Sequence, residues 1–286
     1  MKSGVKLDLH LHTTASDASA SPQDVVRASM EGRLHAIAIA DHDTVSGVQA
    51  AQAASEALSG PMVIAGVELS VEFATELHIL GYFVDIHHPE LLQAFETLQY
   101  HRRRRTQVML ERLKRLNMPL ETQDVLRYAG GESMGRVHIA RAMAEKGYVK
   151  DMDEAFEKWL VIGRPAYVPR ERFKLEESID LLHRAGAAAC WAHPNLTTRD
   201  ETTQYALLRR MADLGLDGVE CYCPTNSPQD ERRLRGWCQR LRLKVTGGSD
   251  WHGTGDARPG SATAHWPVEK DYPNIAGQID RRERFL

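Results

Sequence analysis

The chain has 286 residues, of which 42% are hydrophobic and 26% charged, a composition typical of a globular protein with a sizeable core. A net charge of −3 excludes the broad basic surface that binding to duplex DNA requires. The sequence contains no signal peptide, lipidation motif or long apolar span, and its four cysteines favour a reducing compartment, so we expect a cytoplasmic protein without a membrane partner.

The first predicted strand covers residues 7–11, where leucines alternate with Asp8 and His10, and His12 follows at the same spacing. Because alternate side chains of a strand share a face, the imidazoles of His10 and His12 project together, opposite the leucines. Asp17 follows in the loop after the strand. Two histidines at this spacing can chelate one cation, so this stretch is a candidate metal site that needs partners from elsewhere.

Strands and helices alternate over the next part of the chain. Ser21-Pro22 marks the start of a helix that stops at Gly32. The other expected elements are strands at 36–40, 62–68 and 77–82 and an Ala-rich helix at about 47–58. These strands end in or carry polar residues, namely the run Asp41–Thr44, Glu68 and His78. This rhythm favours an α/β barrel or a doubly wound sheet, where chemistry lies at the carboxyl ends of the strands.

From about residue 89 to residue 167 the sequence indicates helices alone, and this segment is interpreted as a helical insertion. Its apolar stripe, spaced by three and four residues, is interrupted by Arg102 and Arg105. The run 101–105 fits a solvated charged face, but two arginines on the packing side also fit an anionic ligand beneath the helix.

Residues 130–138 form a glycine-rich loop that leads into a helix at 139–146 and contains Arg136 and His138. The loop is either a phosphate grip or a flexible connector. Arg164 closes the insertion as a further candidate cation.

The α/β rhythm then resumes, with helices expected at about 175–185, 202–214 and 228–241 and strands at 187–193, 218–223 and 244–246. His193 ends the first of these strands, and the last runs into Asp250 and His252, which repeat the spacing of the opening pair. Cys221 and Cys223 lie in an apolar strand and are interpreted as core thiols rather than ligands.

Nine ligand-type residues therefore fall at strand ends or in the loops beside them. They are His10, His12, Asp17, His42, Glu68, His78, His193, Asp250 and His252. Six imidazoles and three carboxylates exceed what one cation needs and suit two or three ions, with Glu68 or Asp250 as a bridge. A mixture of imidazole and carboxylate ligands favours Mn, Zn or Fe over Mg or Ca. The ligands do not decide among these three metals, of which manganese is the first expectation.

This set of motifs resembles that of the PHP (polymerase and histidinol phosphatase) family, over residues 1–88 and about 172–260. The resemblance implies a distorted (β/α)7 barrel, formed by residues 1–88 and 172–286, with an inserted helical cap at 89–171. It also implies a trinuclear metal site and hydrolysis of phosphoesters. Within that site, one ion would take His10, His12, Glu68 and Asp250, a second Glu68, His78 and His193, and a third Asp17, His42 and His252. Members of this family often have histidine where Asp17 stands.

The expected mechanism follows from the charges. A metal-bridging hydroxide attacks phosphorus in line, while the cations neutralise the phosphoryl oxygens. Either His193 or His252 would protonate the leaving oxygen, and Asp17 is grouped with them as a catalytic candidate.

The insertion resembles that of the PHP subgroup acting on 3',5'-nucleoside bisphosphates and short RNA ends. One phosphate would lie over the metals, and Arg102, Arg105, Arg136 and His138 would hold the second group, with Arg164 and Asn226 as weaker candidates. The leading hypothesis is a phosphatase that removes the 3'-phosphate and leaves a 5'-monophosphate.

Several alternatives remain open. One is a 5'-3' exoribonuclease acting on short RNA, and another is a histidinol phosphatase, which would not need the arginines of the insertion. The run Ile39–Val45 also matches the signature of haloacid dehalogenase-type phosphatases, with Asp41 as nucleophile. The alternative without catalysis is a metal-dependent regulatory or nucleic-acid-binding module, in which loss of ligands would be expected. The sequence leaves the oligomeric state open.

Overall fold

A computed structural model describes residues 5–128, 135–254 and 258–268, in which seven strands form one sheet. The strands follow each other in chain order: β1 (Leu7–Leu11), β2 (Ala36–Ile39), β3 (Met62–Ser70), β4 (His78–Tyr82), β5 (Ala188–Trp191), β6 (Gly218–Tyr222) and β7 (Lys244–Gly247). Neighbouring strands are parallel, except that β4 is antiparallel to both β3 and β5.

The two edges of the sheet meet just beyond β1 and β7. Leu11 forms a bridge with Trp251, and the backbone N–H of His12 donates to the carbonyl of Trp251 at 3.1 Å. The sheet is therefore a nearly closed barrel, which confirms the expected distorted (β/α)7 architecture.

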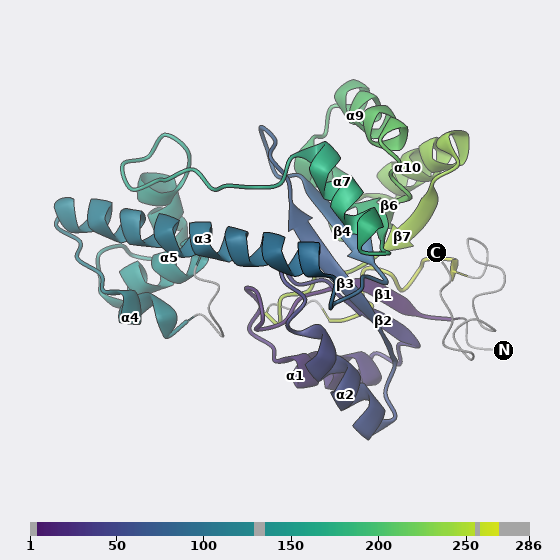
Figure 1. Ribbon diagram of the computed structural model, residues 1–286, viewed down its shortest axis with the longest axis horizontal. Coiled ribbons are helices and arrows are strands. Elements are labelled where there is room, and N and C mark those ends of the chain that lie inside the picture. The colour runs from purple at the N-terminus through teal and green to yellow at the C-terminus, as the bar shows by residue number, and fades with distance from the viewer. Residues whose placement is uncertain (1–4, 129–134, 255–257, 269–286) are drawn as a thin grey trace.

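Most barrel helices begin and end where local signals place them. They are α1 (Pro22–Glu31), α2 (Val48–Leu58), α7 (Leu175–Arg184), α8 (Pro194–Thr197), α9 (Glu201–Asp213) and α10 (Pro228–Leu241). In α1, the Ser21 side chain accepts the N–H of Asp24, proline occupies the first turn and Gly32 caps the end. Figure 1 shows α1 and α2 beside β1 to β3, and α7, α9 and α10 around β4 to β7.

The direction of β4 differs from the expected rhythm. A short connection joins β3 to β4, with the N–H of Val71 donating to the carbonyl of Leu77 at 2.9 Å, so no helix intervenes. His78 is consequently the first residue of β4 and not a residue at its carboxyl end. Because the strand is reversed, His78 still reaches the sheet edge that carries the carboxyl ends of the other strands.

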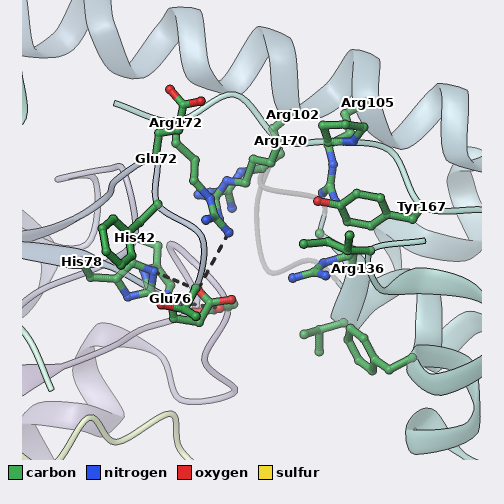
Figure 2. Close-up of a pocket in the computed structure, with 18 of the residues that line it drawn as sticks. His42, Glu72, Glu76, His78, Arg102, Arg105, Arg136, Tyr167, Arg170 and Arg172 are labelled. Carbon is green, nitrogen blue, oxygen red and sulfur yellow. Dashed lines mark ion pairs between the residues drawn. The ribbon is translucent and has the colours of Figure 1, made fainter. Parts of the chain in front are cut away.

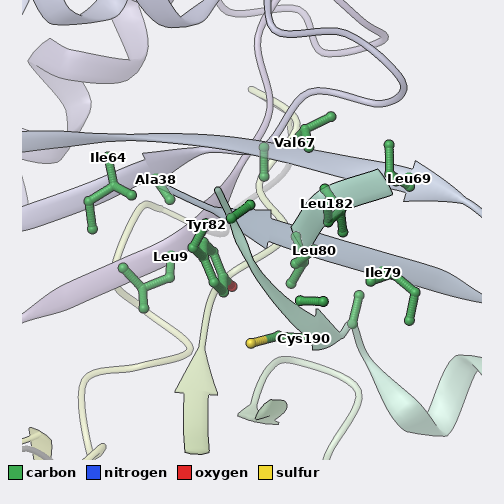
Figure 3. Packing of buried hydrophobic residues seen from close by; sticks show 14 of the residues in the cluster. Leu9, Ala38, Ile64, Val67, Leu69, Ile79, Leu80, Tyr82, Leu182 and Cys190 are labelled. Carbon is green, nitrogen blue, oxygen red and sulfur yellow. The ribbon is translucent and has the colours of Figure 1, made fainter. Parts of the chain in front are cut away.

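The described residues bury two hydrophobic clusters. The larger fills the barrel and the space beneath its helices, and Figure 3 shows part of it around Leu80, Tyr82 and Leu182. Cys221 and Cys223 are buried and free, which confirms them as core thiols.

The second cluster belongs to the helical segment between β4 and α7. This segment contains α3 (Pro89–Arg115), α4 (Thr122–Leu126), α5 (Arg136–Glu145), α6 (Met152–Ala155) and the π-helical turn η1 (Phe156–Leu160). The long helix α3 packs Leu91 and Phe95 on the barrel and Met109 and Leu113 in the second cluster. It leads away from the sheet to α4 and α5 (Figure 1). Among the described residues, no helix has both the length and the apolar character that crossing a membrane requires.

Gly66 in β3 provides a test of how tightly the strands are packed. A Cβ at Gly66 would lie 2.6 Å from the carbonyl oxygen of Ile39, a backbone atom of β2 that cannot rotate away. We expect Gly66→Ala to destabilise the protein by about 1–3 kcal/mol in urea unfolding. A Cβ at Gly236 in α10 would meet nothing within 4 Å, so Gly236→Ala should be neutral or stabilising by up to about 1 kcal/mol. Equal effects of the two substitutions would contradict this account.

Candidate metal centre

Glu68 lies at the centre of a cluster of imidazoles at the barrel mouth. Its carboxylate, fully buried, has five imidazole nitrogens nearby: Nδ1 of His42 at 2.8 Å, Nδ1 of His78 and Nε2 of His193 at 2.9 Å, and Nε2 of His10 and His12 at 3.4 Å. These residues come from β1, β4 and the loops after β1, β2 and β5. One carboxylate from β3 therefore joins the ends of several strands.

Asp250 and Asp17 complete the cluster on the other side of His12. An oxygen of Asp250 lies 3.1 Å from Nε2 of His12 and 3.4 Å from Nε2 of His10. Asp17 lies 3.4 Å from Nε2 of His252 and 3.7 Å from Nε2 of His42. All nine predicted ligands thus lie in one contiguous group.

The ligand atoms form three overlapping sets, each with its members within 4.8 Å of one another. The sets are His10, His12, Glu68 and Asp250; His42, Glu68 and His78; and His12, Asp17, His42 and His252. The first set is the one expected for one ion. The second contains His42 in place of the expected His193, and the third contains His12 in addition to the three expected residues. His193 lies beside the second set, with its Nε2 3.3 Å from Nδ1 of His78.

The donor atoms fit a divalent cation. Within the described chain, buried atoms without a hydrogen-bond partner include Nε2 of His10, both ring nitrogens of His12, Nδ1 of His42, Oε2 of Glu68 and Oδ1 of Asp17. Burying so many unsatisfied polar atoms is costly, and a cation between them would satisfy both the nitrogens and the carboxylates. The atoms are lone-pair donors of the kind that Mn, Zn and Fe accept.

Mutual electrostatics sets the charge of each group in the cluster. Burial alone would raise the pKa of Glu68, but His42, His78 and His10 hold it well below its usual range. Burial, together with the nearby His252, lowers the pKa of His12 to about 4. Glu68 is therefore ionised and His12 neutral at physiological pH, as metal binding requires. Burial alone would lower the pKa of His78 and His252, but the nearby carboxylates of Glu68 and Asp17 raise it to about 9, so a cation would displace a proton from these two rings.

The buried carboxylate of Asp41 supports the loop that follows β1. The side chain of Asp41 accepts the N–H of Thr13 at 2.7 Å, the hydroxyl of Thr13 at 2.8 Å and the hydroxyl of Ser16 at 2.6 Å. It thereby fixes the turn that leads to Asp17. Because Asp41 is buried and its oxygens accept these hydrogen bonds, its position argues against the dehalogenase-type alternative, in which it would be the nucleophile.

A cavity of about 560 Å³ opens beside the cluster, between the barrel and the helical segment. His42, His78 and Asp17 line one side of it. The lining also contains a group of cations, here called the arginine wall: Arg102, Arg105, Arg136, Arg170 and Arg172. Figure 2 shows His42 and His78 across the cavity from Arg105, Arg136 and Tyr167.

The arginine wall is crowded with positive charge. Burial and the neighbouring Arg170 lower the pKa of Arg102 to about 10, and burial and Arg136 lower that of Arg105 to about 10. Asp43 partly neutralises the charge of two arginines of the wall, since its carboxylate lies 2.9 Å from Arg102 and also pairs with Arg170. Among the described residues, Arg105 and Arg136 form no close ion pair and donate to the carbonyls of Val168 and Leu160. Glu76 lies near enough to Arg136 to oppose in part the lowering of its pKa by burial. This wall is suited to an anionic ligand.

Comparison with known proteins identifies the family. A family model described as the PHP domain matches residues 8–164, more than half of the chain. The chain belongs to the PHP family. It is 33% identical over 247 residues to a 5'-3' exoribonuclease, Rnm, from Salmonella typhimurium, with 86% of this chain and 84% of the relative covered.

Two further comparisons concern Chromobacterium violaceum. The chain is 29% identical over 284 residues to a 3',5'-nucleoside bisphosphate phosphatase of that organism, covering 96% and 95% of the two proteins. A solved structure from the same organism, described as an amidohydrolase with bound sulfate, matches with a TM-score of 0.80 at 29% identity, covering 90% of each chain. The protein is a metal-dependent phosphoesterase of the PHP family.

Four of the six residues expected to bind substrate in this PHP protein line the cavity, namely Arg102, Arg105, Arg136 and His138. The structure places the other two elsewhere. Arg164 is exposed in a turn, and the Asn226 side chain donates to the carbonyl of Cys221 at 3.0 Å. Residues 130–134 of the glycine-rich loop lie outside the described residues. Of the three catalytic candidates, Asp17 lines the cavity, whereas His193 and His252 do not.

Sequence reasoning missed Arg170 and Arg172, which follow the helical segment in an irregular stretch. It also missed Asp43, although this residue lay in a motif already singled out. Glu76 was missed as well, and it lies 3.4 Å from Nε2 of His78 and 3.9 Å from Arg172. Charged residues in a stretch without periodicity carry no local signal of direction, so only the fold shows that they face the cavity.

Proposed function

We propose that this PHP protein removes the 3'-phosphate from 3',5'-nucleoside bisphosphates and leaves 5'-monophosphates. The observation that carries the proposal is that one cavity is lined by both ligand-type side chains and the arginine wall. A substrate with two phosphates would satisfy both groups at once. Histidinol phosphate has a single phosphate and an amine, and it would leave Arg105 and Arg136 without a phosphate to bind.

We also propose the division of labour within the chain. Residues 1–88 and 172–286 would form the hydrolase barrel, and residues 89–171 a cap that binds the substrate. The cap contributes Arg102 and Arg105 from α3 and Arg136 from α5 to the cavity. In this arrangement the barrel performs the chemistry and the cap selects the substrate.

The protein's own residues have distinct roles in the proposed reaction. A bound divalent cation would supply Lewis-acid stabilisation of the phosphoryl oxygens and would lower the pKa of water. The ligand-type residues would hold the cations, with manganese as the proposed metal. Arg105 and Arg136 would bind the 5'-phosphate and orient the nucleotide. Either His193 or His252, whichever is not held by a cation, would protonate the 3'-oxygen as it leaves.

The mouth of the cavity supports a nucleotide as the substrate. Three exposed aliphatic side chains line it: Val137 at 41%, Ile162 at 74% and Leu196 at 43% exposure. Two come from the cap segment and one from the barrel. Exposed apolar side chains beside a charged cavity suit the flat, weakly polar face of a nucleobase. Such side chains would contact the base without forming hydrogen bonds to it. We therefore expect little preference between bases.

A second candidate function is 5'-3' hydrolysis of short RNA, which the Rnm relatives at 33% and 32% identity favour. The two reactions share their chemistry, because each would break the bond between phosphorus and the 3'-oxygen of a nucleotide carrying a 5'-phosphate. They differ in the group attached beyond the scissile bond, which is a free phosphate in one substrate and the next nucleotide in the other.

One experiment tests both candidates. Manganese-loaded protein is incubated with adenosine 3',5'-bisphosphate, a 5'-phosphorylated dinucleotide and a longer 5'-phosphorylated RNA, and the initial rates of phosphate and nucleotide release are compared. The proposal expects the bisphosphate to have the highest kcat/KM. Absence of phosphate release from the bisphosphate by metal-loaded protein would reject the first function, and a rising rate with RNA length would establish the second.

A further inference from the structure

Glu220 is a buried carboxylate that the proposed chemistry leaves without a role. It lies in the middle of β6, and its exposed fraction is 0%. Within the described chain, it belongs to none of the three sets of potential ligands. Burying a carboxylate is costly unless its oxygens are satisfied, so its two contacts indicate what it does.

Both oxygens of Glu220 contact histidines of the metal centre. Oε1 lies 3.0 Å from Nδ1 of His10, and Oε2 accepts the backbone N–H of His193 at 2.8 Å. His193 has a φ of 29° and a ψ of 65°, a left-handed conformation that a non-glycine residue adopts only when its surroundings enforce it. One carboxylate thus fixes a ring on β1 and a strained backbone after β5.

The contact with His10 also selects its tautomer. An ionised carboxylate can only accept hydrogen bonds, so Nδ1 of His10 must be the donor. In the neutral ring, Nε2 then carries the lone pair, and this atom lies 3.4 Å from both Glu68 and Asp250. The nitrogen that faces the other ligands is therefore the one available to a cation.

Gly248 packs closely against both Glu220 and His10. A Cβ at Gly248, just after β7, would lie 2.9 Å from Oε1 of Glu220 and 2.2 Å from Cβ of His10. Only glycine fits at this position without displacing the carboxylate or the imidazole.

We propose that Glu220 is a positioning residue of the metal centre, which orients two of its histidines by accepting the Nδ1–H of His10 and the backbone N–H of His193. Glu220 acts through the ligands and does not line the cavity beside them. The inference rests on the metal centre of the proposed function and not on its substrate.

The sharpest test is Glu220→Gln, which keeps the volume of the side chain but gives it one acceptor and one donor. The N–H of His193 cannot rotate, so the amide oxygen should face it and the amide NH₂ should face His10. Nδ1 of His10 must then accept, which moves its proton to Nε2 and blocks the ligand nitrogen. We expect Mn²⁺ to bind about 10–100-fold more weakly in a titration of metal-free protein by calorimetry, without substrate.

A matched control is Glu231→Gln, which alters another buried glutamate that contacts a histidine, with Nε2 of His265 at 2.8 Å. Neither residue of this pair belongs to a ligand set in the described part of the chain, so the variant should bind Mn²⁺ like the parent. In Glu220→Gln, excess Mn²⁺ should restore kcat while the KM for substrate stays unchanged, a pattern that general loss of structure would not give. Because the titration needs no substrate, its outcome is independent of whether the bisphosphate is hydrolysed.

Glu220→Asp provides a second variant that keeps the charge but is too short to reach both histidines. It should bind Mn²⁺ with an affinity between those of the parent and Glu220→Gln, and it serves as the test if Glu220→Gln fails to fold by circular dichroism. Parent-like Mn²⁺ affinity in a folded Glu220→Gln or Glu220→Asp protein would overturn the proposal.

Discussion

Glu68→Gln is expected to lower kcat by about 10³-fold or more and to release bound metal at the same time. The carboxylate joins two of the three ligand sets and lies within 3.4 Å of five imidazoles, so its loss removes a charge that several cations would share. Cation stabilisation of a phosphoryl-transfer transition state contributes several kcal/mol, and about 4 kcal/mol corresponds to about 10³-fold in rate. Metal content by elemental analysis and kcat on the bisphosphate check the expectation together.

Glu72 offers a matched control, because its carboxylate lines the same cavity but belongs to none of the ligand sets found among the described residues. Glu72→Gln should retain its metal and most of its turnover. If Glu68→Gln kept a full complement of metal and a normal kcat, the proposed role of Glu68 as a shared metal ligand would be rejected. Loss of metal in both variants would instead point to general unfolding, which thermal melting detects.

Arg105→Ala and Arg136→Ala are each expected to raise the KM for the bisphosphate by about 10–100-fold with a smaller change in kcat. These guanidiniums belong to the arginine wall and form no close ion pair in the described chain, and Arg105 is almost fully buried. A hydrogen bond between charged groups contributes about 1.5–3 kcal/mol, which sets the size of the effect. Steady-state kinetics on adenosine 3',5'-bisphosphate provide the measurement.

The substrate itself supplies the strictest comparison for this prediction. Adenosine 3'-monophosphate lacks the 5'-phosphate, so its kcat/KM should change little in either variant, and the preference for the bisphosphate should collapse. Arg164→Ala is the control, since Arg164 is exposed and outside the cavity. Equal losses on the two substrates would mean that the arginine wall supports the fold and does not bind the second phosphate.

Local patterns in the sequence were sufficient for much of the fold. The alternation around His10 and His12 and the proline-containing helix starts depend on neighbouring residues alone, and the structure has these elements within a few residues of their expected bounds. The interruption of an apolar stripe by Arg102 and Arg105 likewise showed which side chains turn inward, because helical periodicity fixes direction.

Tertiary structure decided how distant residues meet. The reversed direction of β4 brings His78 to the metal centre from the beginning of a strand, which no local pattern predicts. The contacts of Asp43 with Arg102 and Arg170 depend on how the helical segment returns to the barrel. Glu220 meets His10 across 210 residues of sequence, because the two strands face the same barrel interior. Such contacts depend on the order of the strands and the closure of the barrel, which the whole chain determines together. Residue type and spacing therefore suggested the metal ligands, whereas only the fold showed which residues position those ligands.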